Sequence, residues 1–294
     1  MAEASDLDPK AVRRQFARRA ATLQRADFLL RETERHLLER LEVVRLQPAT
    51  ALDVGCGLGG SLARLAQRYP QAILYGCDLA WPVAAQARSV LTPPTRGLLA
   101  RLSARPPLPL AHVFAADGHS LPLPDSRVDM IWSNLVFHWF ADPVRAVEEW
   151  YRVIRPDGLV TFTALGVDSF RELRAAGARL MTFPDMHDVG DLLTSSGFAE
   201  PVMDMRHLTL TYRDATALLG DARAIGGNAL RTRFHGLLGR GHRQEWLDAI
   251  EGGRGADGLL RLTLELVYGH AWCPARKRLP DGLARIEIVR RRKG

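Results

Sequence analysis

The sequence has little lysine and little cysteine, and it contains no long apolar run. Only Lys10, Lys277 and Lys293 are lysines, although Lys and Arg together number 40 among the 294 residues. The three cysteines are too few and too scattered for a disulfide framework or a zinc site. No segment approaches the roughly 18 apolar residues of a membrane helix, and the amino terminus lacks the apolar core of a secretion signal. We therefore expect a cytoplasmic protein without a membrane partner.

The chain is basic overall but slightly acidic through most of its length. Its formal net charge of +7 alone would suggest a nucleic-acid binder. Residues 46–205, however, hold 13 basic and 16 acidic residues, whereas residues 276–294 hold 8 basic and 2 acidic residues. The positive excess therefore lies near the ends of the chain. This distribution does not favour nucleic acid as a partner.

Apolar segments and helical patterns alternate along the chain. We predict strands at residues 50–54, 73–77, 113–116, 128–133, 159–164, 202–212 and 260–272. We predict helices at residues 61–69, 80–90, 142–154, 168–182, 187–196 and, with a break at Gly226 and Gly227, 214–250. Strands that alternate with helices imply an α/β fold with a mainly parallel sheet.

Three regions follow from this order of elements. Residues 10–45 carry apolar side chains at helical spacing, so residues 1–45 are predicted to form a helical arm. Residues 46–275 form the main domain, with a helical insertion at about 214–255, and residues 276–294 form a basic, solvated tail. Because the arm and the insertion lie outside the predicted sheet, we expect the arm to be a lid and the insertion to wall the substrate pocket.

A glycine-rich loop follows the first predicted strand directly. It reads Asp53-Val-Gly55-Cys-Gly57-Leu-Gly59, and its glycines permit a tight turn and let a ligand approach main-chain N–H groups. The glycine spacing is shorter than the G-x-G-x-x-G of dinucleotide enzymes. Asp53 would repel the phosphates of a dinucleotide, whereas it could attract the ammonium group of an amino acid.

Polar side chains end the next three predicted strands as well. Asp78 follows the second strand, where a carboxylate can hold ribose hydroxyls, and Asp117 follows the third, where it can accept from an adenine amino group. Asn134 follows the fourth strand. These strand ends meet in one crevice, so together they indicate a nucleoside that carries an ammonium group, which is S-adenosylmethionine. The predicted cofactor-binding residues are Asp53, Gly55, Gly57, Gly59, Asp78, Leu79, Asp117, Gly118 and Asn134.

The run from Leu52 to Gly59, with Asp78 and Asp117 after it, resembles the class I S-adenosylmethionine-dependent methyltransferases. This resemblance implies a Rossmann-like, seven-stranded, mostly parallel sheet whose last strand is antiparallel. Methyltransferases that act on the amino groups of nucleic acids carry an Asn/Asp-Pro-Pro-aromatic run after the fourth strand. This chain has Ser133-Asn-Leu-Val-Phe137 there, without proline, so we expect no nucleic-acid substrate.

Segments in both halves of the chain resemble the malonyl-acyl-carrier-protein O-methyltransferases of biotin synthesis. They are Trp132-Ser-Asn-Leu135 with Trp139, Tyr151-Arg-Val-Ile-Arg-Pro156, Pro184-Asp-Met-His-Asp188, Leu208-Thr-Leu-Thr-Tyr212 and Tyr268-Gly-His-Ala-Trp272. The resemblance implies methyl transfer to the free carboxylate of malonyl-acyl carrier protein or malonyl-coenzyme A, and we expect the enzyme to be a monomer. The chain departs from the family pattern at His138, where Gln is usual, and at Leu23, where Tyr is common.

A malonyl carboxylate is already ionised at neutral pH, so the transfer needs no general base. A buried carboxylate does need a donor or a cation beside it. Our catalytic candidates are His187, in the segment most particular to the family, and His138 and Trp139, just beyond the fourth strand. His187 could instead cap the helix that follows it, and Trp139 could be a packing residue.

Three other functions stay open at this point. The pair His138-Trp139 and the Glu172-Leu173 region also resemble the complex I assembly factors that hydroxylate arginine. A factor that binds S-adenosylmethionine without catalysis and a small-molecule O-methyltransferase fit the same cofactor motif.

Overall fold

The computed structural model describes residues 6–19, 27–92, 111–226, 229–232 and 240–275. The predicted basic tail at 276–294 and Leu23 lie outside the described residues. None of the helices in the described ranges has both the length and the apolar character needed to cross a lipid bilayer.

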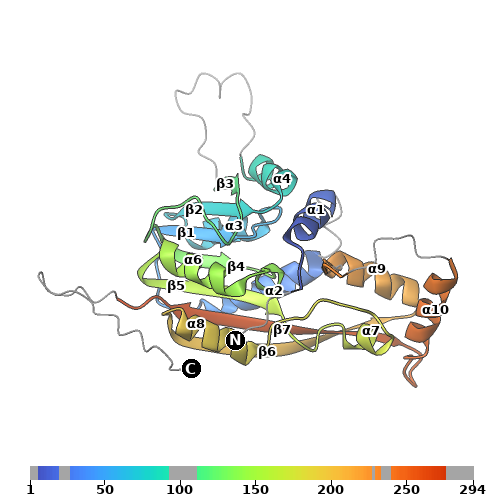
Figure 1. Cartoon of the computed structure of the whole chain (residues 1–294). Helices are drawn as coiled ribbons and strands as arrows, with labels where there is room; N and C mark the ends of the chain where they lie inside the picture. The colour runs from blue at the N-terminus through green and yellow to red at the C-terminus, as the bar shows by residue number, and fades with distance from the viewer. Residues whose placement is uncertain (1–5, 20–26, 93–110, 227–228, 233–239, 276–294) are drawn as a thin grey trace, which may run out of the picture.

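Seven strands form one sheet in the order β3-β2-β1-β4-β5-β7-β6 (Figure 1). Neighbouring strands from β3 to β5 are parallel, whereas β7 runs antiparallel to both β5 and β6. The predicted sheet, mostly parallel with an antiparallel last strand, is thus confirmed. Because β1 pairs with both β2 and β4, the strand order reverses beside β1, and a crevice opens at such a point. The strands are β1 Thr50–Val54, β2 Ile73–Asp78, β3 His112–Ala115, β4 Val128–Ser133, β5 Ile154–Leu165, β6 Ala199–Tyr212 and β7 Leu260–Trp272.

Helices cover both faces of the sheet, as the alternation of side chains along the strands requires. In β4, Met130 and Trp132 belong to one hydrophobic cluster and Ile131 to another, because successive side chains of a strand point to opposite faces. Helices α2, α3 and α4 contribute to the first cluster, and α6 and α8 to the second. The helices are α1 Pro9–Arg19, α2 Asp27–Arg40, α3 Gly60–Arg68, α4 Trp81–Leu91, α6 Pro143–Val153, α7 Arg171–Ala175, α8 Met186–Ser195, α9 Ala215–Ile225 and α10 Arg240–Glu251.

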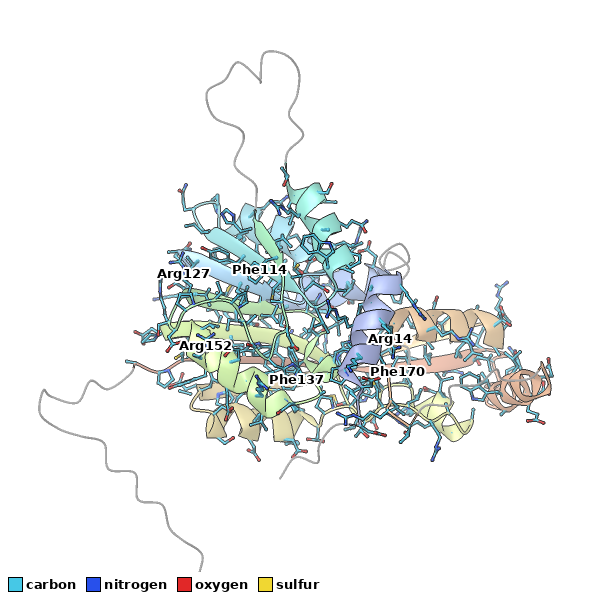
Figure 2. The ribbon with its side chains drawn as sticks, turned by 45° about the horizontal axis from the view of Figure 1, so that its top comes forward. Arg14, Phe114, Arg127, Phe137, Arg152 and Phe170 are labelled. Atoms are coloured by element: carbon cyan, nitrogen blue, oxygen red, sulfur yellow. The ribbon has the colours of Figure 1, made fainter. Side chains whose placement is uncertain are left out.

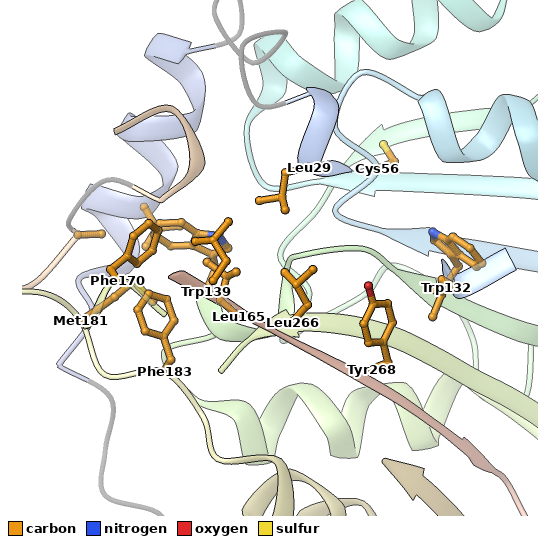
Figure 3. Close-up of a cluster of buried hydrophobic side chains, with 14 of the residues drawn as sticks. Leu29, Cys56, Trp132, Trp139, Leu165, Phe170, Met181, Phe183, Leu266 and Tyr268 are labelled. Atoms are coloured by element: carbon orange, nitrogen blue, oxygen red, sulfur yellow. The ribbon is translucent and has the colours of Figure 1, made fainter. Parts of the chain in front are cut away.

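Aromatic side chains fill the centre of both clusters. On the α6 face, Phe137, which is labelled in Figure 2, is the central ring. It packs on Trp150 and Phe162, with ring centroids 5.8 and 5.2 Å apart. On the other face, Trp132 and Tyr268 lie along the sheet, whereas Trp139 lies with the aromatic rings near the strand ends (Figure 3). Trp139 therefore stands at the border between the core and the crevice.

The fifth strand is longer than predicted. We expected it at 159–164, but β5 begins at Ile154 and includes Pro156-Asp157-Gly158, residues that are typical of a turn. Asp157 adopts φ 62°, and its N–H donates to the carbonyl oxygen of Cys273 at 2.7 Å. Ile154 pairs with Val128 of β4. Pairing with both neighbouring strands thus overrides the local turn signal.

Two predicted helix boundaries are also wrong. The helix expected at 168–182 is much shorter, since α7 ends at Ala175. Gly177, two residues further on, has φ 83°, which is not a helical conformation. The helix after the glycine loop was predicted at 61–69, but α3 begins at Gly60, with Gly59 in the N-cap position. The loop therefore leads into the helix without a side-chain cap.

The described part of the amino-terminal arm is attached to both the sheet and the insertion. Leu7 forms an antiparallel bridge with Leu230, and the N–H of Asp8 donates to the carbonyl oxygen of Ala229 at 2.9 Å. The Arg40 guanidinium, at the end of α2, lies 4.1 Å from the centre of the Tyr268 ring on β7. The arm is thus held in place over the carboxyl ends of the strands (Figure 1).

Candidate cofactor and active site

A cavity of about 810 Å³ opens at the carboxyl ends of the central strands. Its walls are residues 54–58, 60–61, 77–79, 116–119, 134–136 and 139–141, together with side chains of α1, α2 and α4 and Arg64 of α3. Small-molecule sites commonly enclose roughly 300–1,000 Å³. The arm therefore completes a chamber of ligand size at the place where the strand order reverses.

The glycine loop forms the floor of this cavity. Gly55 has φ 77°, and a side chain there would overlap Val136. Gly57 has φ 53° and faces open space: apart from its chain neighbours, no atom of the described residues lies within 4 Å of the place where a side-chain methyl group would be. The N–H groups of Gly55 and Cys56 both donate to the carbonyl oxygen of Cys77, at 2.8 and 2.9 Å. These bonds fix the turn while Gly57 leaves room for a ligand.

Two predicted carboxylates lie in the cavity wall. Asp78 accepts from the N–H groups of Gly57, at 3.2 Å, and Ala80, at 2.9 Å, and burial raises its pKa to about 6. Asp117 accepts from Nδ1 of His119 at 2.6 Å, and this hydrogen bond helps to hold the pKa of Asp117 below its usual value. Leu79 and Gly118 line the cavity beside them. Both carboxylates stand where hydroxyl and amino groups of a nucleoside can reach them.

Asp53 lies behind the loop and is not one of the residues that line the cavity. It is 1% exposed, and its Oδ2 has no hydrogen-bond partner within the described residues. Desolvation, together with the charges of Glu34 and Asp78, raises the pKa of Asp53 well above its usual value. Asp53 thus lies buried behind the loop without a direct face on the cavity, and its raised pKa favours the neutral acid. Gly59 is also outside the lining, where it turns the chain into α3.

Glu34 is a cavity residue that the sequence reasoning missed. It comes from α2, is 4% exposed, and leaves Oε1 without a hydrogen-bond partner in the described structure. Its Oε2 pairs with Nε of Arg64 on α3 at 2.8 Å. A signal was available, since Glu34 lies four residues after Leu30 and three before Leu37, on the apolar face of the helix.

Asn134 lines the cavity, but its side-chain amide forms hydrogen bonds with other residues of the protein. Its Nδ2 donates to the carbonyl oxygen of Leu30 on α2 at 3.0 Å, and its Oδ1 accepts from the Thr163 hydroxyl at 2.7 Å. The Thr163 hydroxyl oxygen in turn accepts from the N–H of Leu135. Asn134 therefore ties the arm to the end of β4 beside the cavity.

The three catalytic candidates occupy different environments. Trp139 lines the cavity and meets Phe16 of α1 edge to face, with ring centroids 5.2 Å apart. His138 is buried outside the lining, where burial lowers its pKa to about 3 and its Nδ1 accepts from the N–H of Leu165. Neutral His138 is therefore no cation; because its Nδ1 accepts, its Nε2 carries the proton and can still donate a hydrogen bond.

His187 does not line the cavity either. It is exposed in the first turn of α8, and its N–H donates to Oδ1 of Asp185, which caps that helix. The expected contact between His187 and the substrate carboxylate is therefore not supported by this geometry. We also expected the insertion at 214–255 to wall the substrate pocket. None of its described residues lines this cavity.

The chemistry of the cavity fits S-adenosylmethionine. The carboxylate oxygen of Glu34 that is unpartnered among the described residues favours a cationic ligand, Asp78 and Asp117 can accept from a nucleoside, and Gly57 leaves space for close approach. Apolar side chains of Val12, Phe16, Leu30, Val136 and Trp139 complete the walls. Such a chamber can hold a charged nucleoside beside an apolar arm of a second substrate.

Comparisons with known proteins agree with this assignment. Residues 52–162 match the family model described as a methyltransferase domain. A malonyl-[acyl-carrier protein] O-methyltransferase of Methylovorus sp. is 40% identical, covering 98% of this chain and 97% of the relative. One of Laribacter hongkongensis is 41% identical, with 98% of both chains covered.

Solved structures show the same fold at low sequence identity. A putative methyltransferase in complex with the Haloferax volcanii Trm112 activator matches with a TM-score of 0.56 and 16% identity, covering 91% of this chain and 100% of that one. A putative methyltransferase of Bacillus halodurans matches with a TM-score of 0.56 and 15% identity, covering 81% and 99%.

Proposed function

Because the chain belongs to the malonyl-[acyl-carrier protein] O-methyltransferases, we propose that it methylates the free carboxylate of malonyl-acyl carrier protein in the synthesis of a biotin precursor. The activity is an S-adenosylmethionine-dependent methyl transfer. The observation that carries the proposal is 40% identity to such an enzyme over 98% of this chain, both halves included. We further propose that the enzyme works as a cytoplasmic monomer.

Residues at the carboxyl ends of the strands hold the cofactor in this proposal. Asp78 accepts from the ribose hydroxyls and Asp117 from the adenine amino group, while Gly57 allows the ligand to approach the backbone. Leu79 and Gly118 flank these contacts. When bound, S-adenosylmethionine supplies an electrophilic methyl group on a sulfonium centre.

The protein's contribution to the transfer is to position the acceptor and to exclude water. A malonyl carboxylate has a pKa about three units below neutral pH, so no protein group has to remove a proton. Alignment of the acceptor oxygen with the methyl group can supply about 7–11 kcal/mol of the barrier reduction. Phe16 and Trp139 form an apolar wall against which the thioester end of the acceptor can pack.

A panel of acyl carriers tests the proposal. The enzyme and S-adenosylmethionine are incubated separately with malonyl-, succinyl- and acetyl-carrier proteins and with malonyl-coenzyme A. The intact mass of each product is then measured by mass spectrometry. We expect one added methyl group on malonyl-carrier protein and none on the acetyl form, which lacks a free carboxylate. Mild alkali should remove the added methyl group, because it is held in an ester. Cofactor binding without methylation of any malonyl thioester would refute the proposal.

A further inference from the structure

Glu34 keeps one buried carboxylate oxygen without a partner within the described ranges, although Arg64 already binds the other. The side chain is 4% exposed and lines the same cavity as Asp78. Arg64 and the nearby Ser61 hydroxyl favour its charged form, but its Oε1 has no hydrogen-bond partner in the described structure. Burying a carboxylate oxygen without a partner is costly, whereas a leucine at this apolar position of α2 would bury at no such cost. The chain therefore carries a charge that packing alone does not require.

The charges around Glu34 show what kind of group would complete it. Asp53 lies close enough for its charge and that of Glu34 to interact, and burial raises the pKa of both carboxyl groups. On the other side of Glu34, Nε of Arg64 lies 2.8 Å from Oε2. Arg64 also lines the cavity, and a guanidinium carries five N–H donors, of which the contact with Glu34 uses one. A carboxylate and a guanidinium thus stand side by side at one end of the chamber.

We propose that Glu34 and Arg64 form the subsite that recognises the zwitterionic amino-acid end of S-adenosylmethionine. Glu34 binds the ammonium group through Oε1, and Arg64 binds the carboxylate with its remaining donors. The proposal rests on the function proposed above, because that function makes S-adenosylmethionine the ligand.

This subsite gives the amino-terminal arm a direct part in cofactor recognition. Glu34 belongs to α2, Arg64 to α3 and Asp53 to β1, so a ligand held by the first two residues links the arm to the sheet. The ligand contact adds to the hydrogen bond between Asn134 and the carbonyl oxygen of Leu30. Binding of the amino-acid end therefore stabilises α2 in its place over the cavity.

Three nucleosides separate the contributions of the two charges. S-Adenosylhomocysteine has both the ammonium group and the carboxylate, its decarboxylated analogue keeps only the ammonium group, and methylthioadenosine has neither. Binding of each is measured by calorimetry for the wild-type chain and for Glu34→Gln, Arg64→Gln and Glu39→Gln. Glu39 is the control because its side chain, on the same helix, is 48% exposed and does not line the cavity.

Loss of a charged hydrogen bond should weaken binding about tenfold or more. We expect this loss in Glu34→Gln for S-adenosylhomocysteine and for the decarboxylated analogue, with methylthioadenosine binding unchanged. Arg64→Gln should weaken only S-adenosylhomocysteine, and Glu39→Gln should weaken none. An equal loss for all three ligands in Glu34→Gln, or no loss for any, would overturn the proposal. Failure of the wild-type chain to bind any of them would refute the proposed function as well.

Hydrogen–deuterium exchange gives a second readout that does not depend on catalysis. S-Adenosylhomocysteine should slow amide exchange in α2 more than methylthioadenosine does at equal saturation. This difference should disappear in Glu34→Gln. Equal protection of α2 by the two ligands in the wild-type chain would contradict the role of the arm.

Discussion

Replacement of Gly55 by alanine should destabilise the protein through two separable costs. The residue has φ 77°, a conformation that costs an alanine about 1–2 kcal/mol. The new methyl group would also overlap Cγ2 of Val136 and lie 2.9 Å from its Cγ1. The loop cannot easily move away, because the N–H groups of Gly55 and Cys56 both donate hydrogen bonds to the carbonyl oxygen of Cys77. Overpacking typically costs about 1–3 kcal/mol. We therefore expect Gly55→Ala to lower the free energy of unfolding by about 2–5 kcal/mol, measured by urea denaturation.

Gly57 provides the matched control. Its φ is 53°, but apart from its chain neighbours no atom of the described residues lies within 4 Å of the position that a methyl group would take, so Gly57→Ala should cost only about 1–2 kcal/mol. In the double variant Gly55→Ala/Val136→Ala the overlapping methyl groups are absent. It should therefore be more stable than the sum of the two single losses predicts, by about 1–3 kcal/mol. Equal losses for the two glycine variants, with strict additivity in the double variant, would show that the steric argument is wrong.

Three further predictions concern the walls of the cavity and its surroundings. Burial lowers the pKa of His138 to about 3, so the side chain is neutral, and His138→Gln, which can still accept the backbone hydrogen bond, should keep kcat and stability. His138→Ala should lower the free energy of unfolding, measured by urea denaturation, by roughly 2–4 kcal/mol. Burial raises the pKa of Asp78 to about 6, so S-adenosylhomocysteine affinity, followed by calorimetry, should fall as the pH drops below about 6, and Asp78→Asn should remove this dependence. Because that pKa lies above the value in an unfolded chain, the stabilisation of the unliganded protein by Asp78 is greatest below about pH 4 and is lost as the pH rises through about 6. Phe16→Leu, which loses the edge contact with Trp139, should raise KM for malonyl-carrier protein about two- to tenfold in steady-state assays, whereas the exposed Phe28→Leu should not.

The positions of the central strands and of the glycine loop could be predicted because their signals are local. A short apolar strand leads directly into Gly55-Cys-Gly57, and Asp78 ends the next strand, so the sequence alone places these residues in one crevice. The resemblance to class I methyltransferases predicted the antiparallel last strand, which pairs with β5 and β6 as expected. Residue types that a turn or a strand end requires are visible without tertiary information.

Features that depend on the docking of the arm could not be predicted in the same way. The burial of Glu34 results from the packing of α2 against the sheet, and its neighbour Arg64 lies 30 positions further along the chain. His187 looked important because of its sequence context, but the position of α8 leaves it exposed. Asn134 ends β4 as predicted, yet its amide group binds Leu30 of the arm. Local sequence does not show which partners tertiary packing gives to a polar side chain.

The most direct test of carboxyl methylation follows the methyl group itself. Malonyl-carrier protein is incubated with the enzyme and S-adenosylmethionine labelled with carbon-13 in its methyl group, and the product is examined by carbon-13 nuclear magnetic resonance. We predict a single new signal at the chemical shift of a methyl ester, which mild alkali converts to methanol. Carboxyl methylation would be contradicted if the labelled methyl group were found on nitrogen or carbon. It would also be contradicted if the label stayed on S-adenosylmethionine although the wild-type enzyme was saturated with this cofactor.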